Sequence, residues 1–389
     1  MHRHLARFWI PFALLLVLGA LPAAAKPSSI LDDEQFREEV RRGLDRLYDM
    51  DYAGAGAAFA AIAQRYPDHP VVPFLRALPA WWEIQVDPDD DSHDDAFFDA
   101  MEEVIKRCDR RLKADRQDLD GMFFKAGALA FRGRLQSDRK NWLRAALDGR
   151  KALQLLEDVR KRDPQNPDLL LGVGLFDYLA DVVPQKYPIL KRFARFFPQG
   201  NRARGLQELA QAVEQGKFVP TEAAFCLVQI HYIFERDYAT ALHYSRWLRD
   251  RYPNNALFHV YEGRTYARLN LWPDERQDLL DVLERHAEGR TGYRGDVTQQ
   301  ALYVLGRDEV RWKSFDDALS HLSRLEILPN RGRTDSDYKA YGRLYRGMAL
   351  DALGRRDEAL YWYNRALATR PPDEVRDKAR NYLRVPYQG

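Results

Sequence analysis

The sequence predicts an all-α protein, organised as a right-handed superhelical solenoid of about eight helix-turn-helix repeats with a C-terminal capping helix. The first observation is an internal repeat: residues 51–67 read DYAGAGAAFAAIAQRYP, and residues 237–253 read DYATALHYSRWLRDRYP. In each copy an alanine follows the aspartate by four residues and precedes the proline by twelve. The second observation is that strand signals are scarce, because prolines and glycines separate helical stretches rather than alternating apolar runs. Repeats of this kind stack on their neighbours, which makes a solenoid the expected architecture.

The copy near the C-terminus has the clearest spacing of small and large residues. Small residues such as Gly347 and Ala359 let two antiparallel helices approach closely, and a proline ends the second helix because it cannot continue the hydrogen-bond ladder. The key positions of this copy are Gly347, Leu350, Gly354, Ala359, Ala366 and Pro371. This pattern resembles the tetratricopeptide repeat, a helix-turn-helix unit of about 34 residues. Arrays of that repeat bind partners on a concave face lined by the first helix of each unit, so the resemblance implies a groove for a peptide or protein segment.

We expect eight units, followed by a helix over residues 373–384 that covers the apolar face of the last repeat. Gly306 and Ala318 keep the twelve-residue step of Gly347 and Ala359, whereas Glu275 stands where the unit that begins near Gly263 should have an alanine. Several units are longer than 34 residues, which indicates insertions. The units cover residues 34–68, 71–113, 119–166, 167–216, 219–254, 256–290, 297–331 and 337–372.

The middle of the chain, over residues 165–255, carries a more specific set of positions. These are Gly172, Gly174, Phe176, Pro184, Gly200, Arg202, Gly205, Leu206 and Leu209, followed by Glu222, Leu227 and Tyr232. In these residues the chain resembles the central region of the tetratricopeptide repeat protein 39 family and its fungal relative, the mitochondrial outer-membrane inclusion-body clearance protein. With the N-terminal segment described below, the resemblance implies a bacterial secreted member of that family. The resemblance implies a helical adaptor-like protein near membranes, without a reaction. One departure is Asn201, which stands where the family pattern has an aspartate.

The first 25 residues have the organisation of a secretory signal peptide. Arg3 and Arg7 form a basic start, residues 8–21 are apolar, and three alanines ending at Ala25 precede Lys26. The alternative is an uncleaved anchor, but the apolar stretch is shorter than the roughly 20 residues that span a bilayer. We therefore expect a periplasmic or secreted protein that is cleaved near Ala25, with a linker over residues 26–33 and the solenoid over residues 34–389.

The charge balance argues against nucleic acid as a partner. Cleavage removes two arginines, so the 60 Lys and Arg residues become 58, against 58 Asp and Glu residues. Nucleic-acid binding typically requires a clear excess of positive charge. Cys108 and Cys226 are the two cysteines of the chain. Because they lie in different repeats, we expect two buried thiols rather than a disulfide.

A basic strip is predicted on the concave face. If Gly263 and Gly306 are equivalent, the next position holds Arg264 and Arg307, and four residues further on lie Arg268 and Arg311. Each pair shares one face of its helix, and the planar guanidinium group suits carboxylates. The strip predicts binding of an acidic peptide or of a C-terminal carboxylate. The alternative is ordinary solvated charge, or ion pairs with the nearby Glu262 and Glu309.

Residues 184–205 form an insertion with a second candidate surface, a membrane contact through Lys191, Arg192, Arg195 and Phe196. The aromatic residues of this segment recur at helical spacing, with the basic residues on the other side. A basic amphipathic helix lies on an anionic membrane. The alternative is that the apolar stripe packs on the next repeat.

An acidic run and a pair of tryptophans could each have either a binding role or a purely structural role. The acidic run over residues 87–103 suggests Ca²⁺, but an EF-hand loop would need a central glycine and a closing glutamate, where this chain has Ser92 and Phe98. Asp94 and Asp95 instead favour the N-terminus of the next helix. Trp81 and Trp82 are either an exposed anchor or part of the core.

Catalytic signatures are missing from the sequence. It contains no HExxH pair, no GxSxG elbow, no P-loop and no dinucleotide fingerprint. Cys226 and His231 would diverge on a shared helix and could not act as nucleophile and base. We therefore expect a non-enzymatic protein with no cofactor and no metal.

Overall fold

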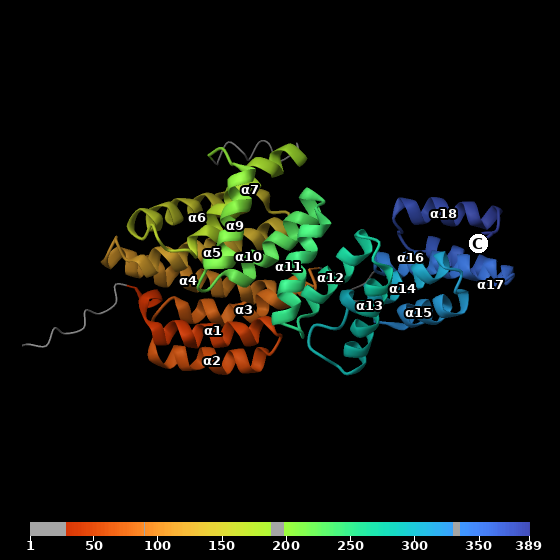
Figure 1. Ribbon diagram of the computed structural model, residues 1–389, viewed down its shortest axis with the longest axis horizontal. Helices are drawn as coiled ribbons and strands as arrows, with labels where there is room; N and C mark the ends of the chain where they lie inside the picture. Colours follow the sequence, from red (N-terminus) through yellow and green to blue (C-terminus); the bar gives the residue numbers. More distant parts are fainter. Residues whose placement is uncertain (1–28, 89, 188–197, 330–334) are drawn as a thin grey trace, which may run out of the picture.

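The computed structural model describes residues 29–88, 90–187, 198–329 and 335–389. Every regular element in these ranges is a helix, and no β-strand occurs in them. Consecutive helices form pairs that stack along the chain (Figure 1). The predicted all-α repeat solenoid is confirmed.

Within the described ranges, eight helix pairs and one further helix follow each other in chain order. Each pair falls inside its predicted unit, except that α4 ends one residue later and α14 begins one residue earlier. The pairs are α1 (Glu34–Tyr48) with α2 (Tyr52–Arg65), α3 (Val71–Val86) with α4 (Asp94–Ala114), α5 (Leu119–Asp138) with α6 (Trp142–Arg162), α7 (Leu169–Lys186) with α9 (Arg202–Gln215), α10 (Pro220–Gln229) with α11 (Tyr238–Arg251), α12 (Ala256–Arg268) with α13 (Trp272–Ala287), α14 (Asp296–Arg311) with α15 (Phe315–Ile327), and α16 (Asp337–Ala352) with α17 (Arg356–Leu367). A π-helical segment, η3 (Ile230–Glu235), extends α10, and α18 (Asp373–Arg384) covers the last pair.

The aspartate of the repeated segment is the N-cap of the second helix in its unit. The side chain of Asp51 accepts a hydrogen bond from the Gly54 backbone N–H at 2.8 Å, and Asp237 accepts one from the Thr240 N–H at 3.1 Å. An aspartate at this position satisfies a backbone donor that the helix itself cannot pair. This explains why the two copies share their first residue.

Small residues mark the helix crossings, as the spacing predicts. Ala55, Ala241, Ala318 and Ala359 are all fully buried. In the unit where an alanine is missing, Glu275 takes this position and is buried as well. A carboxyl group therefore occupies a site where the other units place a methyl group.

The additional residues of the second and third units lengthen helices rather than loops. α4 and α6 each have 21 residues, and α5 has 20. The insertions that the unit lengths indicate therefore lie within the helices of these two units. A long amphipathic helix adds a turn without exposing unpaired backbone groups, which makes this form of insertion inexpensive.

The glycines of the central segment permit a close crossing between α7 and α9. A Cβ atom on Gly205 would lie 2.6 Å from the Gly174 carbonyl oxygen and 2.6 Å from the Tyr178 backbone nitrogen. Such distances are shorter than van der Waals contact, so only glycine fits. Asn201 caps α9 by accepting a hydrogen bond from the Arg204 N–H at 2.9 Å, so the departure from aspartate keeps the cap.

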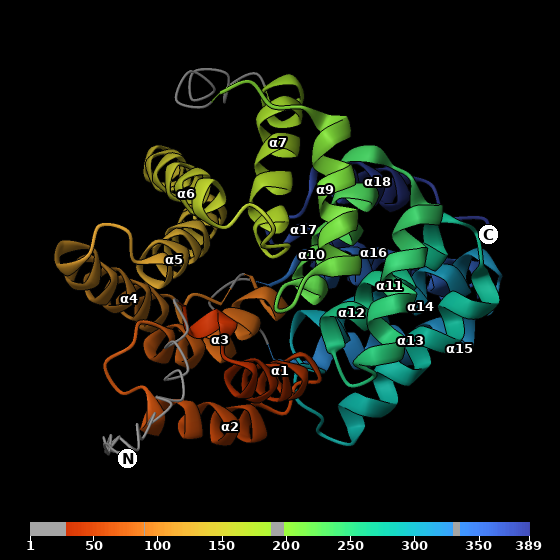
Figure 2. The same cartoon turned by 60° about the vertical axis from the view of Figure 1, so that its left-hand side comes forward.

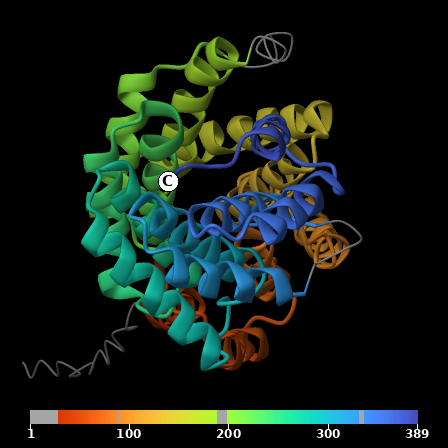
Figure 3. The ribbon, with the colours of Figure 1, turned by 90° about the vertical axis from the view of Figure 1, so that its right-hand side faces the viewer.

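The first pairs do not form an open groove, because the chain closes on itself. The Trp82 ring of α3 packs against Tyr48 of α1, Phe225 of α10 and Phe258 of α12, with ring centres 5.6, 5.8 and 5.5 Å away. Residues from these distant helices share one hydrophobic core. A second core joins α12 to α18. The C-terminal pairs thus extend from a closed N-terminal lobe, as the views in Figures 1 and 3 show.

Hydrogen bonds fasten this closure at the turn after α1. Asn254, just before α12, pairs with the Asp49 carboxylate through its backbone N–H at 2.9 Å and its side-chain amide at 2.8 Å. The amide of Asn255 donates to the Tyr48 carbonyl oxygen at 2.6 Å. α12 is therefore the helix at which the closed lobe meets the C-terminal pairs.

Candidate functional site: an arginine–aromatic surface

The four arginines of the predicted basic strip lie on two neighbouring first helices. Arg264 and Arg268 belong to α12, and Arg307 and Arg311 belong to α14. The positive charges of Arg268 and Arg307 are close enough to interact, and Arg307 and Arg311 both act on the carboxyl group of Glu275. The structure therefore brings these predicted residues together.

Two of the guanidinium groups stack on tyrosines of their own helix. The Arg264 guanidinium carbon is 5.6 Å from the ring centre of Tyr261, and that of Arg307 is 5.7 Å from the ring centre of Tyr303. Such cation–ring contacts hold a guanidinium group against the helix surface. These tyrosines were not among the predicted site residues, although spacings of three and four residues along a helix signal such a contact.

The other two arginines stack on rings from neighbouring elements. Arg268 lies 5.8 Å from both Tyr232 of η3 and Tyr238 of α11, and Arg311 lies 5.5 Å from Trp272 at the start of α13. No local spacing signals these contacts. We call the whole set the arginine–aromatic surface, and its members are Arg264, Arg268, Arg307, Arg311, Tyr232, Tyr238, Tyr261, Trp272 and Tyr303.

A polar ladder crosses three first helices beside this surface. Gln300 of α14 accepts hydrogen bonds from Arg264 of α12 at 3.0 Å and from the Tyr338 hydroxyl of α16 at 3.3 Å. Further tyrosine rings of α16 surround Tyr303, with centres 5.5 and 6.1 Å away for Tyr341 and Tyr345. The surface thus continues along three consecutive first helices, α12, α14 and α16.

The positive charge is unevenly available across the surface. The buried Asp308 accepts two hydrogen bonds from Arg307, at 2.8 and 2.9 Å, and a weaker one from Arg311 at 3.5 Å. In the part of the chain that the structure describes, no carboxylate lies within 4.0 Å of Arg264 or Arg268. These two guanidinium groups donate to the neutral Gln300 and Tyr232, so they are the ones whose charge no carboxylate neutralises.

Glu275 gives this surface a titratable group. One of its carboxyl oxygens is buried without a hydrogen-bond partner, and the other lies 3.9 Å from Arg307. Burial, assisted by the charge of Asp308, raises the pKa of Glu275 to about 7. The net charge that faces Arg307 therefore changes near neutral pH.

The nearby glutamates that were the alternative partners of these arginines pair elsewhere. Glu262 accepts a hydrogen bond from Tyr266 at 2.9 Å and lies 3.4 Å from Arg249. Glu309 is hydrogen-bonded with His321 at 2.8 Å. Ion pairs with Glu262 and Glu309 therefore do not position the four arginines of the predicted strip.

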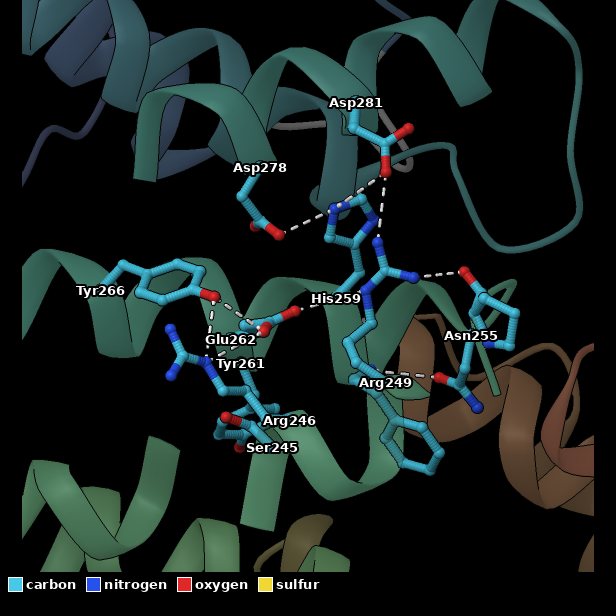
Figure 4. A network of polar contacts seen from close by, with 12 residues as sticks. Ser245, Arg246, Arg249, Asn255, His259, Tyr261, Glu262, Tyr266, Asp278 and Asp281 are labelled. Carbon is cyan, nitrogen blue, oxygen red and sulfur yellow. Dashed lines mark hydrogen bonds and ion pairs between the residues drawn. The ribbon is translucent and has the colours of Figure 1, made fainter. Parts of the chain in front are cut away.

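Behind this surface lies a buried polar network that joins α11, α12 and α13 (Figure 4). His259 has no exposed surface, and its Nε2 atom is 3.0 Å from the Asp278 carboxylate while its Nδ1 atom is 3.1 Å from the Tyr293 hydroxyl. Arg249 reaches Asp281 at 3.1 Å. Burial raises the pKa of Asp278 despite the neighbouring His259.

This network is structural rather than catalytic. A histidine oriented by an aspartate can act as a base, but a base must reach a substrate, and His259 is fully enclosed. The carboxyl group of Asp278 occupies the space where a side chain on Gly263 would otherwise lie. Gly263 thus leaves room for the buried pair formed by His259 and Asp278.

The remaining predicted residues fall into three groups. Lys191, Arg192, Arg195 and Phe196 lie outside the described residues. Trp81 and Trp82 are both buried, so an exposed aromatic anchor at this position is excluded. Both thiols are free, as expected, but Cys108 is buried whereas Cys226 is half-buried, so the prediction of two buried thiols holds for Cys108 alone. Burial of its sulfur raises the pKa of Cys226 to about 11.

The acidic run has a structural role at the start of α4. This helix begins at Asp94, and the Asp94 carboxylate accepts hydrogen bonds from Arg139 at 2.5 and 2.8 Å. Within the described ranges, no group of three or more possible ligand residues is arranged to hold a metal ion. Over the same ranges, no helix is long and apolar enough to cross a membrane.

Comparison with known proteins adds little beyond these observations. No family model matches the sequence, and no match is found among curated proteins. A solved tetratricopeptide repeat protein from Parabacteroides merdae is similar over 90% of this chain and 98% of its own, with 12% identity and a TM-score of 0.27. A TM-score this low supports no argument about function. The chain is therefore described by its own geometry, as an all-α array of helix pairs that resemble tetratricopeptide repeats.

Proposed function

We propose that the protein is a non-enzymatic interaction scaffold that acts in the periplasm, or after secretion, and binds an acidic peptide segment of a partner protein along the arginine–aromatic surface. The observation that carries the proposal is that the guanidinium groups of Arg264 and Arg268 lie over aromatic rings, with no carboxylate within 4.0 Å in the described chain. A guanidinium group fixed in this way loses little side-chain entropy when a carboxylate binds, because its orientation is already set.

The first test is the loss of a partner when these two charges are removed. The chain from Lys26 onward is immobilised and exposed to periplasmic extract, and bound protein is quantified. We expect the Arg264→Ala, Arg268→Ala double variant to bind the partner at least tenfold more weakly, since buried charge-assisted contacts at an interface centre contribute about 2 kcal/mol. Binding of the original chain is expected to weaken as salt rises.

The matched control removes two arginines that lie outside the surface. Arg41 and Arg42 are exposed on α1, so the Arg41→Ala, Arg42→Ala variant loses the same charge and should retain the partner. Equal binding by both double variants would contradict the proposed site. Absence of any retained protein would contradict the scaffold function itself.

Glu275→Gln is expected to remove a pH dependence of this binding. In the original chain, Glu275 is neutral below its pKa of about 7 and becomes a carboxylate beside Arg307 above it. An acidic ligand should therefore bind several-fold more tightly at pH 6 than at pH 8, a difference on the order of 1 kcal/mol. Fluorescence anisotropy of a labelled hexaglutamate peptide measures this, and the variant should bind at both pH values as the original chain does at pH 6. A pH dependence that persists in the variant would exclude Glu275 as its source.

A further inference from the structure

A cavity lies at one edge of the third helix pair, remote from the arginine–aromatic surface. It has a volume of about 280 Å³, is partly open to solvent, and is lined by residues of α4, α5 and the start of α6. Phe98 and Asp99 contribute from α4, Gln136 from α5, and Asn141 and Arg144 from the start of α6. A recess of this size is close to the lower limit of sites that hold a ligand or a large side chain.

Two polar side chains of this cavity, the buried Gln136 and the exposed Asn141, have unused hydrogen-bonding capacity within the described chain. The side-chain oxygen of Gln136 is buried without a hydrogen-bond donor, although the residue is only 8% exposed. Asn141 precedes α6 but makes no side-chain capping bond. Rotation of the Gln136 amide about its last bond, a soft torsion, would turn the oxygen toward the cavity. Unpaired buried polar groups are costly, so an occupant that supplies donors and acceptors is favoured.

The cavity is lined by two arginines, Arg132 and Arg144, and only Arg132 is paired with carboxylates in the described chain. Arg132 donates two hydrogen bonds to Asp148, at 2.7 and 2.8 Å, and a third to Glu102 at 2.7 Å. Arg144, on the opposite rim, is exposed and has no carboxylate within 4.0 Å among the described residues. The two arginines of the cavity therefore differ: Arg132 supports the wall, whereas Arg144 is available to a ligand.

The outer face of α6 beside the cavity is apolar. Trp142, Leu143 and Leu147 are 37%, 55% and 42% exposed. The other large hydrophobic residues that are exposed in the described chain are distributed over several helices, whereas these three lie within two turns. Clustered apolar exposure marks interaction sites more often than scattered exposure does.

Unpaired positive charge shares this face. At 100° per residue, Arg150 and Lys151 lie on the same side of α6 as Leu143 and Leu147, and both are exposed without an ion pair in the described chain. With Arg144, three cations surround two exposed leucines. An occupant that is both apolar and acidic complements this arrangement.

We propose that the cavity and the outer face of α6 form a second binding surface, which takes an acidic amphipathic segment of a partner protein. A large apolar side chain of the segment enters the cavity against Phe98, and its carboxylates meet Arg144 and the cations that follow. Its backbone amides supply partners for Gln136, Asn141 and Asp99. A peptide fits this recess better than a lipid chain does, because an acyl chain would displace water from the exposed Asn141 and Asp99 without replacing its hydrogen bonds.

The two surfaces are on different parts of the molecule. α4, α5 and α6 lie at one side of the closed lobe, and α12, α14 and α16 lie at the other side (Figure 2). One chain can therefore hold two partner segments at once, which is the property that distinguishes an adaptor from a simple receptor. This second surface does not depend on the arginine–aromatic surface being occupied.

The test uses random dodecapeptides displayed on phage, selected on the chain from Lys26 onward. We expect an enriched pattern with a large apolar residue close to aspartate or glutamate. Calorimetry with a selected peptide should show at least tenfold weaker binding to the Arg144→Glu, Leu147→Asp variant. The Arg264→Ala, Arg268→Ala variant should bind the same peptide unchanged. Both altered side chains on α6 are exposed, and circular dichroism checks that the variant remains folded.

Three outcomes would overturn the proposal. The first is that no peptide pattern is enriched, and the second is that selected peptides bind the α6 variant as well as the original chain. The third is that phosphatidylcholine vesicles with one quarter phosphatidylglycerol bind the original chain, lose binding to the α6 variant, and block the selected peptides. That result would assign the surface to an anionic membrane instead.

Discussion

Glu222→Gln is expected to stabilise the protein at pH 8 by up to about 3 kcal/mol and to leave its stability at pH 4 nearly unchanged. The carboxyl group of Glu222, on α10, is buried inside the closed lobe. One oxygen accepts a hydrogen bond from the Tyr48 hydroxyl of α1, and the other has no donor. Burial raises the pKa of Glu222 to about 7, from 4.5 for the unfolded chain.

The direction of the effect follows from proton binding. Between pH 4.5 and pH 7 the folded protein keeps a proton on Glu222 that the unfolded chain has released. Its stability therefore falls as the pH rises through this window, and each unit of difference in pKa contributes about 1.4 kcal/mol. A glutamine is neutral at every pH and still accepts the bond from Tyr48, so it lacks this loss.

Urea unfolding of both proteins at pH 4, 6 and 8 measures the effect. Glu38→Gln is the matched control, since Glu38 is exposed on α1 and should change the stability little at any of these pH values. Other groups, Glu275 among them, titrate in the same window, but they do so equally in both proteins and cancel in the difference. A stability difference that is the same at pH 4 and pH 8 would show that folding does not shift the pKa of Glu222, and burial would then not hold its proton.

The repeats could be predicted because their determinants are local. Asp51 and Asp237 each cap the helix that begins at the next residue, by accepting a hydrogen bond from the backbone N–H three residues further on. Ala55 and Ala241 are buried against the neighbouring helix of their own unit. Such contacts recur at a fixed spacing in the sequence, so they can be predicted from that spacing. The helix over residues 373–384 could be predicted for the same reason, and α18 has these bounds.

The closure of the N-terminal lobe could not be predicted in this way. Tyr48 and Glu222 are 174 residues apart, and no periodicity links their positions. The two tryptophans of α3 illustrate the limit: the sequence alone left open whether they were core or surface, and only the arrival of α10 and α12 decides that Trp82 is enclosed. Contacts between distant repeats depend on the summed rotation of all units between them.

The candidate site shows the same division between local and distant contacts. Equivalent positions in two repeats predicted that the arginines of α12 and α14 share one side, and the charges of Arg268 and Arg307 do interact in the structure. The neutralising partner Asp308 is adjacent to Arg307 in sequence, yet its burial depends on the packing of α13 and α14. The stacking of Arg268 on Tyr232 joins residues 36 positions apart, which lies beyond what helix spacing can indicate.

Trp82→Ala is expected to lower the free energy of unfolding of the N-terminal lobe by about 3 kcal/mol, the low end of the range for large aromatic truncations in a core. The ring is 1% exposed and contacts three other rings from α1, α10 and α12. The low end applies because the indole N–H is buried without a hydrogen-bond partner, so its removal relieves part of the loss. Trp82→Phe should cost much less, since it keeps most of the apolar volume and removes the unpaired N–H.

The effect should also be localised, because a repeat contacts mainly its neighbours and stability in such arrays is distributed unit by unit. We expect hydrogen exchange in Trp82→Ala to rise in α1 and α3, where the closure depends on this ring, while α16 and α17 remain protected by the second core. Trp312→Ala, at a side chain that is 45% exposed, is the control. It should change the free energy of unfolding, and the local stability that hydrogen exchange reports, by no more than about 1 kcal/mol. Uniformly faster exchange along the whole chain would mean that the closed lobe and the C-terminal pairs unfold together, and the closure would then stabilise the array as a single cooperative body.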